Sequence, residues 1–294
     1  MSGLTRRSVV LAGLLAPLWA PARVCAQAQS WPSGPIRIIV PFPPGGSVDA
    51  VARLAQAGLG QRLGVTVVVE NRSGASGSTG SAAVAKSPPD GNTWLVVFDT
   101  HAVNPSLLPN LAFDSDKDLD PVSLIATAPY VVARHPSRPY TNLGELIRAA
   151  KEKPGSISYA SVGSGSIGHL ALELFGKQAG VELIHVPYRG GGPALNDAVA
   201  GHVDLIIASA ALLMPQIQAG AIRALLQLGK TRLLALPEIP TIAEGGYPGA
   251  QASSWWGIFA PAGTPSRSSS ASAPRSLKAC GKSGSPSSSP KPSR

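Results

Sequence analysis

The sequence predicts an α/β fold with two lobes, each a mostly parallel sheet flanked by helices. Short apolar segments alternate with helical segments from residue 36 to about residue 230, a rhythm typical of parallel sheets covered on both faces. Two glycine-rich turns, 41–49 and 161–169, each follow an apolar strand and open a helix. Such a turn leaves backbone N–H groups free at the positive end of a helix, where an anion binds well. Two of them, about 120 residues apart, predict two lobes that hold one small acidic molecule between them.

The individual elements follow from apolar runs that are separated by Gly and Pro. Gly64 ends the first helix, the Pro-Pro-Asp-Gly run at 88–91 precedes the third strand, and Pro154-Gly155 precedes a later strand. We expect strands at 36–40, 65–69, 93–98, 121–125, 129–134, 157–160, 183–186, 204–208 and 222–228. We expect helices at 47–62, 77–86, 101–108, 141–152, 166–179, 191–200 and 210–219.

Two extended segments are candidates for the connections between the lobes. Residues 121–134 contain two extended pieces around Pro129, and the strand at 222–228 is equally apolar. If both cross, lobe one is discontinuous and lobe two is continuous. Lobe one then holds residues 29–125 and 222–265, and lobe two holds residues 126–221. Periodicity alone leaves this arrangement open.

The net charge of +9 does not indicate a nucleic-acid binder. Nine of the 25 Lys and Arg residues lie in the first 28 or the last 29 residues, so residues 29–265 carry 16 basic side chains against all 16 acidic ones. Nucleic-acid binding needs a basic patch on the folded body, and the sequence concentrates none there. With only two cysteines, Cys25 and Cys280, the chain has no disulfide framework.

Residues 1–28 have the pattern of an export signal. Arg6 and Arg7 give a charged start, and the apolar run 9–20 is too short to span a bilayer. Small residues follow it, so we expect cleavage near Ala26–Ala28 and a periplasmic mature protein. The paired arginines permit a twin-arginine route, and an ordinary Sec signal is the alternative.

The composition changes abruptly at Ser266. Residues 266–294 hold 12 serines, four prolines and six basic residues, and Leu277 is their one large apolar side chain. Such a segment cannot bury enough surface to offset its ordering entropy, so we expect a disordered, low-complexity tail. The break also motivates the hypothesis that this tail is an out-of-frame translation, which translating the other reading frames tests.

The first glycine turn supplies several candidate ligand contacts. Phe42 can form a wall, and Gly45 and Gly46 allow a ligand to approach the backbone closely. Asp49 falls in the first helical turn, where its charge either contacts the ligand or only stabilises the helix end.

Two further loops follow strands of the same predicted lobe. Ser76, in a Gly-rich loop after the second strand, can bind a carboxylate, although a helix cap by Ser76 or Ser78 fits the spacing equally well. Thr100 and His101 follow the third strand, and His101 is either an anion donor or a structural residue.

The second glycine turn formally matches a dinucleotide fingerprint, Gly163-x-Gly165-x-x-Gly168. Glu182, the acid about 20 residues further on, precedes the next strand, whereas the ribose-binding acid follows it in nucleotide-binding units. An exported α/β enzyme that uses this turn stays open as the alternative function. The hydrolase, P-loop and zinc-protease motifs are absent from the sequence.

The later segments carry three ambiguous polar residues. Tyr188 can close over a ligand, whereas Arg189 is either a carboxylate partner or an exposed charge. Asp204 starts a predicted strand and is either structural or a ligand contact. The alternating acids of 114–120 fail the calcium-loop pattern, because position six is Leu119 and not Gly.

Together these segments resemble the extracytoplasmic solute receptors of tripartite tricarboxylate transporters, the Bug receptor family. The resemblance runs in the same order from about residue 31 to residue 265. It rests on 31–32, 36–49, 68–77, 89–91, 161–170, 186–192, 201–204 and 259–265.

The resemblance implies a two-lobed periplasmic-binding-protein fold of the Venus-flytrap, type II-like kind. It implies a non-catalytic receptor that captures a small carboxylate for integral membrane transporter subunits, as a monomer and without a metal or organic cofactor. A carboxylate sensor is an alternative, and a degraded gene product is another. The ligand contacts that the resemblance implies are Phe42, Gly45, Gly46, Asp49, Ser76, Thr100, His101, Ser161, Gly165, Ser166, His169, Tyr188 and Asp204. The family continues after Pro265 with helices and a strand, where this chain has its serine-rich tail.

Overall fold

The computed structural model describes residues 31–265, and most elements lie within two residues of the predicted bounds. The strands are β1 (Ile36–Val40), β2 (Val67–Asn71), β3 (Thr93–Phe98), β4 (Leu119–Arg134), β5 (Ser158–Ser161), β6 (Ile184–Pro187), β7 (Leu205–Ser209), β8 (Arg223–Gln227) and β9 (Ser253–Pro261). The helices are α1 (Ser47–Leu63), α2 (Ser78–Ala85), α3 (Thr100–Leu107), α4 (Leu143–Glu152), α5 (Ile167–Ala179), α6 (Gly191–Ala200) and α7 (Ala210–Gln218), with 3₁₀ turns η1 (Ala75–Gly77) and η2 (Pro248–Ala250). The export signal and the tail expected at 1–28 and 266–294 lie outside the described residues.

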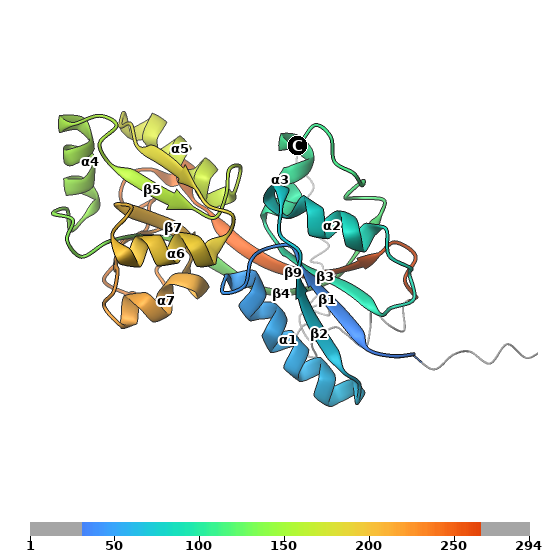
Figure 1. Cartoon of the computed structure of the whole chain (residues 1–294). Coiled ribbons are helices and arrows are strands. Elements are labelled where there is room, and N and C mark those ends of the chain that lie inside the picture. The colour runs from blue at the N-terminus through green and yellow to red at the C-terminus, as the bar shows by residue number, and fades with distance from the viewer. Residues whose placement is uncertain (1–30, 266–294) are drawn as a thin grey trace, which may run out of the picture. The chain divides into compact units, whose positions relative to one another are not determined.

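The strands form two sets that share β4, which we call sheet A and sheet B (Figure 1). Sheet A has the order β2-β1-β3-β9 and ends on the Leu119–Pro129 part of β4. In sheet B, the Tyr130–Arg134 part of β4 pairs with β7 on one side and β8 on the other, and β5 and β6 continue beyond β7. One strand therefore belongs to both sheets.

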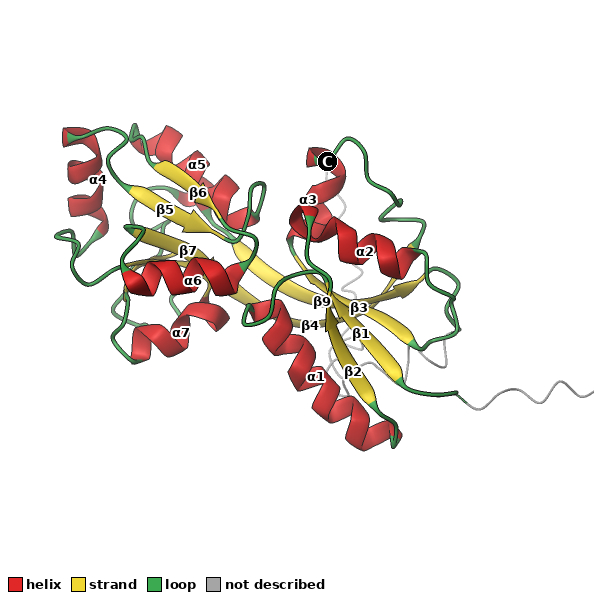
Figure 2. Cartoon of the chain, in the orientation of Figure 1, coloured by secondary structure: helices red, strands yellow, loops and turns green. Residues whose placement is uncertain are grey.

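The outer strands are parallel and the central ones are antiparallel. β1 pairs in parallel with β2 and β3, and β5 pairs in parallel with β6 and β7. β9 runs antiparallel to both β3 and β4. The predicted two-lobed α/β class with flanking helices is confirmed, and the sheet is mixed at its centre (Figure 2).

The connection between the sheets differs from the prediction in two ways. The two pieces expected around Pro129 form the single strand β4, in which Pro129 lies opposite Ser253 of β9. The strand expected at 222–228 does not cross, because β8 pairs with β4 inside sheet B. The chain returns to sheet A through residues 229–252 and enters β9, a strand that the sequence analysis did not predict.

Buried side chains alternate between the faces of β4 and so build separate cores. Val131 and Ala133 join a cluster that continues under α1, α6 and α7, whereas Tyr130 and Val132 join a cluster under α4 and α5. A third cluster, around Leu95 and other β3 residues, lies under α2. Because each face is covered, the loops at the carboxyl ends of the parallel strands are the free surface where a ligand can bind.

Candidate functional site

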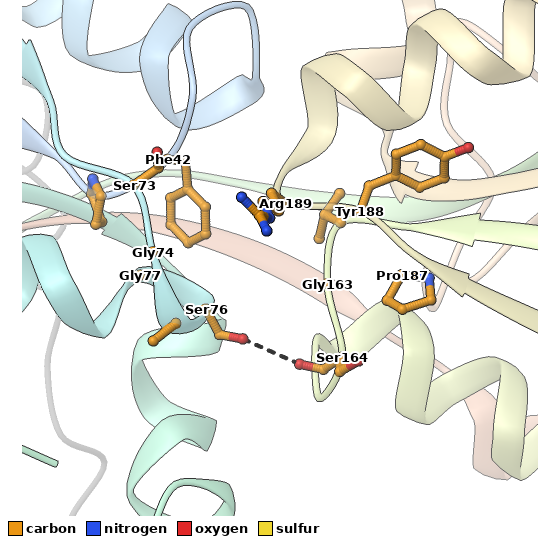
Figure 3. Close-up of a pocket in the computed structure, with 13 residues that line it drawn as sticks. Phe42, Ser73, Gly74, Ser76, Gly77, Gly163, Ser164, Pro187, Tyr188 and Arg189 are labelled. Carbon is orange, nitrogen blue, oxygen red and sulfur yellow. Dashed lines mark hydrogen bonds between the residues drawn. The ribbon is translucent and has the colours of Figure 1, made fainter. Parts of the chain in front are cut away.

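A cavity of about 370 Å³ lies where loops of sheet A face loops of sheet B. Its sheet A side comes from the residues after β1 and from the loop after β2, and its sheet B side comes from the residues after β5 and β6 (Figure 3). These are carboxyl ends of parallel strands, the place where α/β sheets bind ligands. The lining residues are Pro41, Phe42, Ser73, Gly74, Ala75, Ser76, Gly77, Val162, Gly163, Ser164, Pro187, Tyr188 and Arg189.

The first turn supplies the aromatic wall. Phe42 is 6 % exposed and packs edge-on against Phe98, with ring centroids 4.8 Å apart. Its ring also fixes the neighbouring loop, because a Cβ at Gly77 would lie 2.8 Å from the Phe42 Cζ atom. Phe42 is thus held from two sides.

The rest of the first turn supports the site without lining the cavity. Asp49 is buried, and its Oδ2 accepts from the N–H of Gly45 at 3.2 Å and from Nε of Arg53 at 2.9 Å. Burial alone would raise the pKa of Asp49, but the hydrogen bonds from Arg53, Asn71 and Gly45 outweigh it and hold the pKa below its ordinary value. Asp49 is therefore an ionised clamp on the turn, which favours the helix-end alternative weighed above.

Gly45 and Gly46 act through shape. Gly45 has φ of 82°, a left-handed conformation that favours glycine. A Cβ at Gly46 would lie 3.7 Å from the backbone nitrogens of Gly191 and Gly192, so the first turn contacts the start of α6. These glycines bring the two sheets' loops together.

The loop after β2 is the most strained part of the cavity wall. Ala75 and Ser76 have φ of 44° and 53°, between Gly74 and Gly77, which also have positive φ. Non-glycine residues in this region cost free energy and often mark functional sites. The Asn104 side chain holds the loop by donating to the Ser76 carbonyl oxygen at 2.9 Å.

Ser76 connects the two sides of the cavity. Its hydroxyl donates to the carbonyl oxygen of Ser164 at 3.5 Å, and the contact crosses from a sheet A loop to a sheet B loop (Figure 3). The helix-cap alternative is not observed, because Gly77 occupies the N-cap position of α2 and no side chain caps that helix.

The second turn is braced by its own side chains. The Ser161 hydroxyl accepts from the N–H of Gly163 at 3.2 Å, and Ser166 caps α5 by accepting from the N–H of His169 at 3.3 Å. The His169 Nδ1 atom accepts from the N–H of Gly165 at 3.1 Å. The turn is thus shaped by Ser161, Gly165, Ser166 and His169. The cavity wall itself is formed by residues 162–164.

His185 is a supporting residue that the sequence analysis did not select. Its Nε2 atom lies 2.7 Å from the Ser161 hydroxyl, and its ring stacks on His169 with centroids 3.8 Å apart. Burial, together with the nearby His169, lowers the pKa of His185 to about 4. Its position before Pro187 in β6 gave no sign of this contact.

Three more of the predicted contacts, in addition to those of the two turns, do not line the cavity. Thr100 and His101 are buried at the start of α3, where the His101 ring lies 4.8 Å from that of Phe259 and burial lowers its pKa. Asp204 lies beside the start of β5, where its Oδ2 accepts from the N–H of Ser158 at 2.7 Å. Asp204 also pairs with Arg138 at 2.8 Å, so the structural alternative fits it.

The segment after β6 contributes Tyr188 and Arg189. Tyr188 donates its N–H to the Ser161 carbonyl at 3.1 Å and its hydroxyl to Asp197 at 2.6 Å. Burial and this hydrogen bond raise the pKa of Tyr188 to about 12, so the phenol stays neutral. Arg189 is exposed and lines the cavity, although it was not among the contacts that the resemblance implied.

The lining favours an anion. It contains one charged side chain, Arg189, and no carboxylate. Within the described chain, the N–H groups of Gly74 and Ser164 form no hydrogen bond. Residues 31–265 contain no cluster of three or more His, Cys, Asp or Glu side chains that could hold a metal ion. Free N–H groups, hydroxyls and a guanidinium are suitable donors for a carboxylate.

Comparison with known proteins agrees with this chemistry. Residues 51–270 match the family model described as tripartite tricarboxylate transporter family receptor. A protein from the tcbD-tcbE intergenic region of Pseudomonas sp. (strain P51) is 43% identical over 260 residues, which are 88% of this chain and 77% of that protein. Protein BugT of Bordetella pertussis is 39% identical over 258 residues, 87% and 77% of the two chains. The resemblance to the Bug receptors is confirmed.

Two solved structures are similar over most of this chain. The Rhodopseudomonas palustris protein Rpa4515, solved with adipate, is 37% identical with a TM-score of 0.80 and covers 82% of this chain and 81% of its own. MatC (Rpa3494) of the same organism, solved with bound malate, is 33% identical with a TM-score of 0.76 and covers 82% of each chain. The matched family is a receptor family, and two other similar structures are described as a periplasmic transporter and as the periplasmic binding protein BugD, so the enzyme alternative is not supported. In residues 31–265, no helix combines the length and apolar character needed to cross a bilayer.

Proposed function

This chain belongs to the tripartite tricarboxylate transporter receptor family, and we propose that it captures a small carboxylate in the periplasm and delivers it to membrane transporter subunits. One observation carries the proposal: the cavity between the two sheets presents donors and a positive charge but no acidic side chain. An anionic ligand gains hydrogen bonds there without repulsion from a buried carboxylate. No metal or organic cofactor is needed for this binding.

The related structures support the ligand class. Adipate and malate, named for two relatives, are small dicarboxylates, and both relatives are more than 30% identical to this chain. The cavity volume of about 370 Å³ is within the range of small-molecule sites.

We further propose that the protein works as two lobes that close on the ligand. The sheet pairing supports one lobe that holds residues 31–129 and 253–265, and another that holds residues 130–252. A ligand that contacts both lobes favours the closed state, because it binds that state more tightly. The contact from Ser76 to Ser164 is one that closure would form.

A thermal-shift screen of the purified mature protein against C4 to C8 carboxylates tests ligand capture. At a concentration 100 times its dissociation constant, a ligand adds about 2.7 kcal/mol to the free energy of unfolding. The uncharged diamides of the same acids are matched controls and should give no shift. If no carboxylate stabilises a protein that is verified to be folded, the proposal fails.

Delivery and location need separate measurements. We expect the chain in the periplasmic fraction of its host as a monomer, as judged by light scattering. Deleting the gene should abolish uptake of the labelled carboxylate that the purified protein binds. Uptake that continues unchanged would contradict the transport role and leave ligand binding intact.

A further inference from the structure

We propose that Arg189 is a specificity-determining residue that binds the second carboxylate of a dicarboxylate, so that the receptor selects dicarboxylates over monocarboxylates of equal length. This inference rests on the proposed function, because it assigns a role within the same cavity.

Arg189 is the single charged side chain among the residues that line the cavity. Within the described chain, its side chain forms no hydrogen bond and no ion pair, unlike Arg138 and Arg53, which pair with Asp204 and Asp49. A guanidinium presents a planar set of donors that matches a carboxylate in a bidentate geometry. The free guanidinium at the cavity is therefore available to a ligand.

The backbone around Arg189 is held on both sides. Before it, the Tyr188 N–H donates to the Ser161 carbonyl at 3.1 Å and the Tyr188 hydroxyl donates to Asp197 at 2.6 Å. After it, Gly190 has φ of 136°, and a Cβ there would lie 3.0 Å from Cδ of Pro43. Gly190 thus lets the segment pass close to the first turn. The Arg189 side chain starts from a fixed position, which limits the entropy lost on binding.

A separate group of donors occupies another part of the cavity wall. Gly74 and Ser164 line the cavity, and their N–H groups have no partner in the described chain. In Figure 3, the Ser76–Ser164 pair lies apart from Arg189, which lies between Phe42 and Tyr188. The cavity therefore offers two places for negative charge.

The wall between these two places includes apolar side chains. Phe42, Val162 and Pro187 all line the cavity and carry no polar side-chain atom. Methylene groups suit such a surface, because they leave water without losing hydrogen bonds. A linear molecule with a carboxylate at each end and methylenes between matches this distribution.

The test compares pairs of acids that differ only in the second carboxylate. The three pairs are succinate with butanoate, adipate with hexanoate, and suberate with octanoate. Titration calorimetry gives the dissociation constant of each acid for the wild type and for Arg189→Gln. We expect the variant to bind the preferred dicarboxylate about 10- to 100-fold more weakly, as is typical when a charged hydrogen-bond partner is lost. Monocarboxylate binding should change by less than about 2-fold.

Two further variants separate charge from position. Arg148→Gln removes an exposed arginine of α4, outside the cavity lining, and should leave all the constants unchanged. Arg189→Lys keeps the charge but lacks the planar donor fork, so it should recover only part of the affinity. Circular dichroism checks that each variant is folded.

The outcomes distinguish this inference from the proposed function. If the wild type binds these acids but Arg189→Gln weakens both members of a pair equally, Arg189 holds a shared carboxylate and the inference is overturned. If the variant changes neither member, it is overturned as well. If the wild type binds none of the six acids, the inference fails, and the proposed function fails only when the full carboxylate screen is also flat.

Discussion

Tyr130 donates its hydroxyl to the buried carboxylate of Asp99, with 2.9 Å between the two oxygens. Asp99 follows β3 of sheet A, whereas Tyr130 lies on β4 at its first pairing with sheet B. The bond therefore ties the two sheets together beside the strand that they share. Tyr130 also touches α5, since a Cβ at Gly168 would lie 2.9 Å from its ring.

Asp99 should make the protein less stable as the pH rises from about 4 to above 6. Burial raises the pKa of Asp99 from 3.8 to about 6, against the opposing effects of the Ser254 and Tyr130 hydroxyls. When the pKa of a carboxyl is higher in the folded state than in the unfolded state, the group stabilises the fold fully at a pH below the unfolded-state pKa. This contribution is lost as the pH rises past the folded-state pKa. The loss is on the order of 3 kcal/mol.

The measurement for Asp99 is urea unfolding of the wild type and Asp99→Asn between pH 4 and pH 8. The difference between the two curves isolates Asp99 from other titrating groups, and it should move in favour of the variant as the pH rises. Parallel curves would show that the Asp99 pKa is ordinary in the folded protein.

His185 should oppose Asp99 on acidification. Burial and the stacked His169 lower the pKa of His185 to about 4, so its neutral form stabilises the fold above pH 6.5 and this contribution falls as the pH drops toward 4. Because the ring is partly exposed, we expect a reduced effect of about 1–2 kcal/mol. NMR titration of the histidine rings checks it directly, with His185→Gln for assignment. A His185 ring that titrates near pH 6.5 would contradict this prediction.

Gly163→Ala should weaken ligand binding by about tenfold or more. Gly163 lines the cavity with φ of 147°, a conformation that alanine adopts only with strain, so the turn must shift.

The matched control is Gly180→Ala. Gly180 also has a positive φ (63°), but it lies at the end of α5 with open space around it. The control should lose about 1 kcal/mol of stability and keep its affinity. Calorimetry and urea unfolding of both variants measure the two effects, and equal affinities would exclude a role for the second turn.

Leu59→Ala should destabilise the protein far more than Leu54→Ala, although both residues lie on α1. Leu59 is 8% exposed inside the core cluster, and removing a buried leucine side chain costs about 2–5 kcal/mol. Leu54 is 76% exposed, so its truncation should change the stability by less than about 0.5 kcal/mol. Urea unfolding of the two variants checks this, and similar losses would mean that α1 packs through a different face.

The sequence predicted the local elements well because their signals are local. The turn after β1 was recognised from an apolar strand followed by Gly45 and Gly46, and the structure shows a strand, that turn and α1. β9 was missed because it is held by pairing with β3 and β4, which are distant in sequence. Trp255, Trp256, Ile258 and Phe259 favour a strand, but Gly257 interrupts this run.

The sequence predicted which loops form the candidate site better than it predicted which residues line the cavity. Phe42, Ser76 and Tyr188 line the cavity, whereas Gly165, Ser166 and the other turn residues brace it. Asp204 directly precedes β7 and accepts a hydrogen bond from the N–H of Ser158 at the start of β5, the end opposite to the cavity-lining turn. A sequence indicates that a polar residue flanks a strand, but the choice between cavity wall and support depends on side-chain geometry.

If the two lobes close on a ligand as proposed, β4 limits how the cavity can widen, because it belongs to both sheets. β4 runs for 16 residues without interruption, and its register against β9 shifts between Pro121 and Ser123 and again between Leu124 and Ala126. Irregular pairing of this kind permits local twisting while the remaining ladder stays intact. Ligand entry and release would then depend on the backbone flexibility of β4 and β9. A change that makes this pairing more rigid would slow ligand binding and release without altering any residue that contacts the ligand.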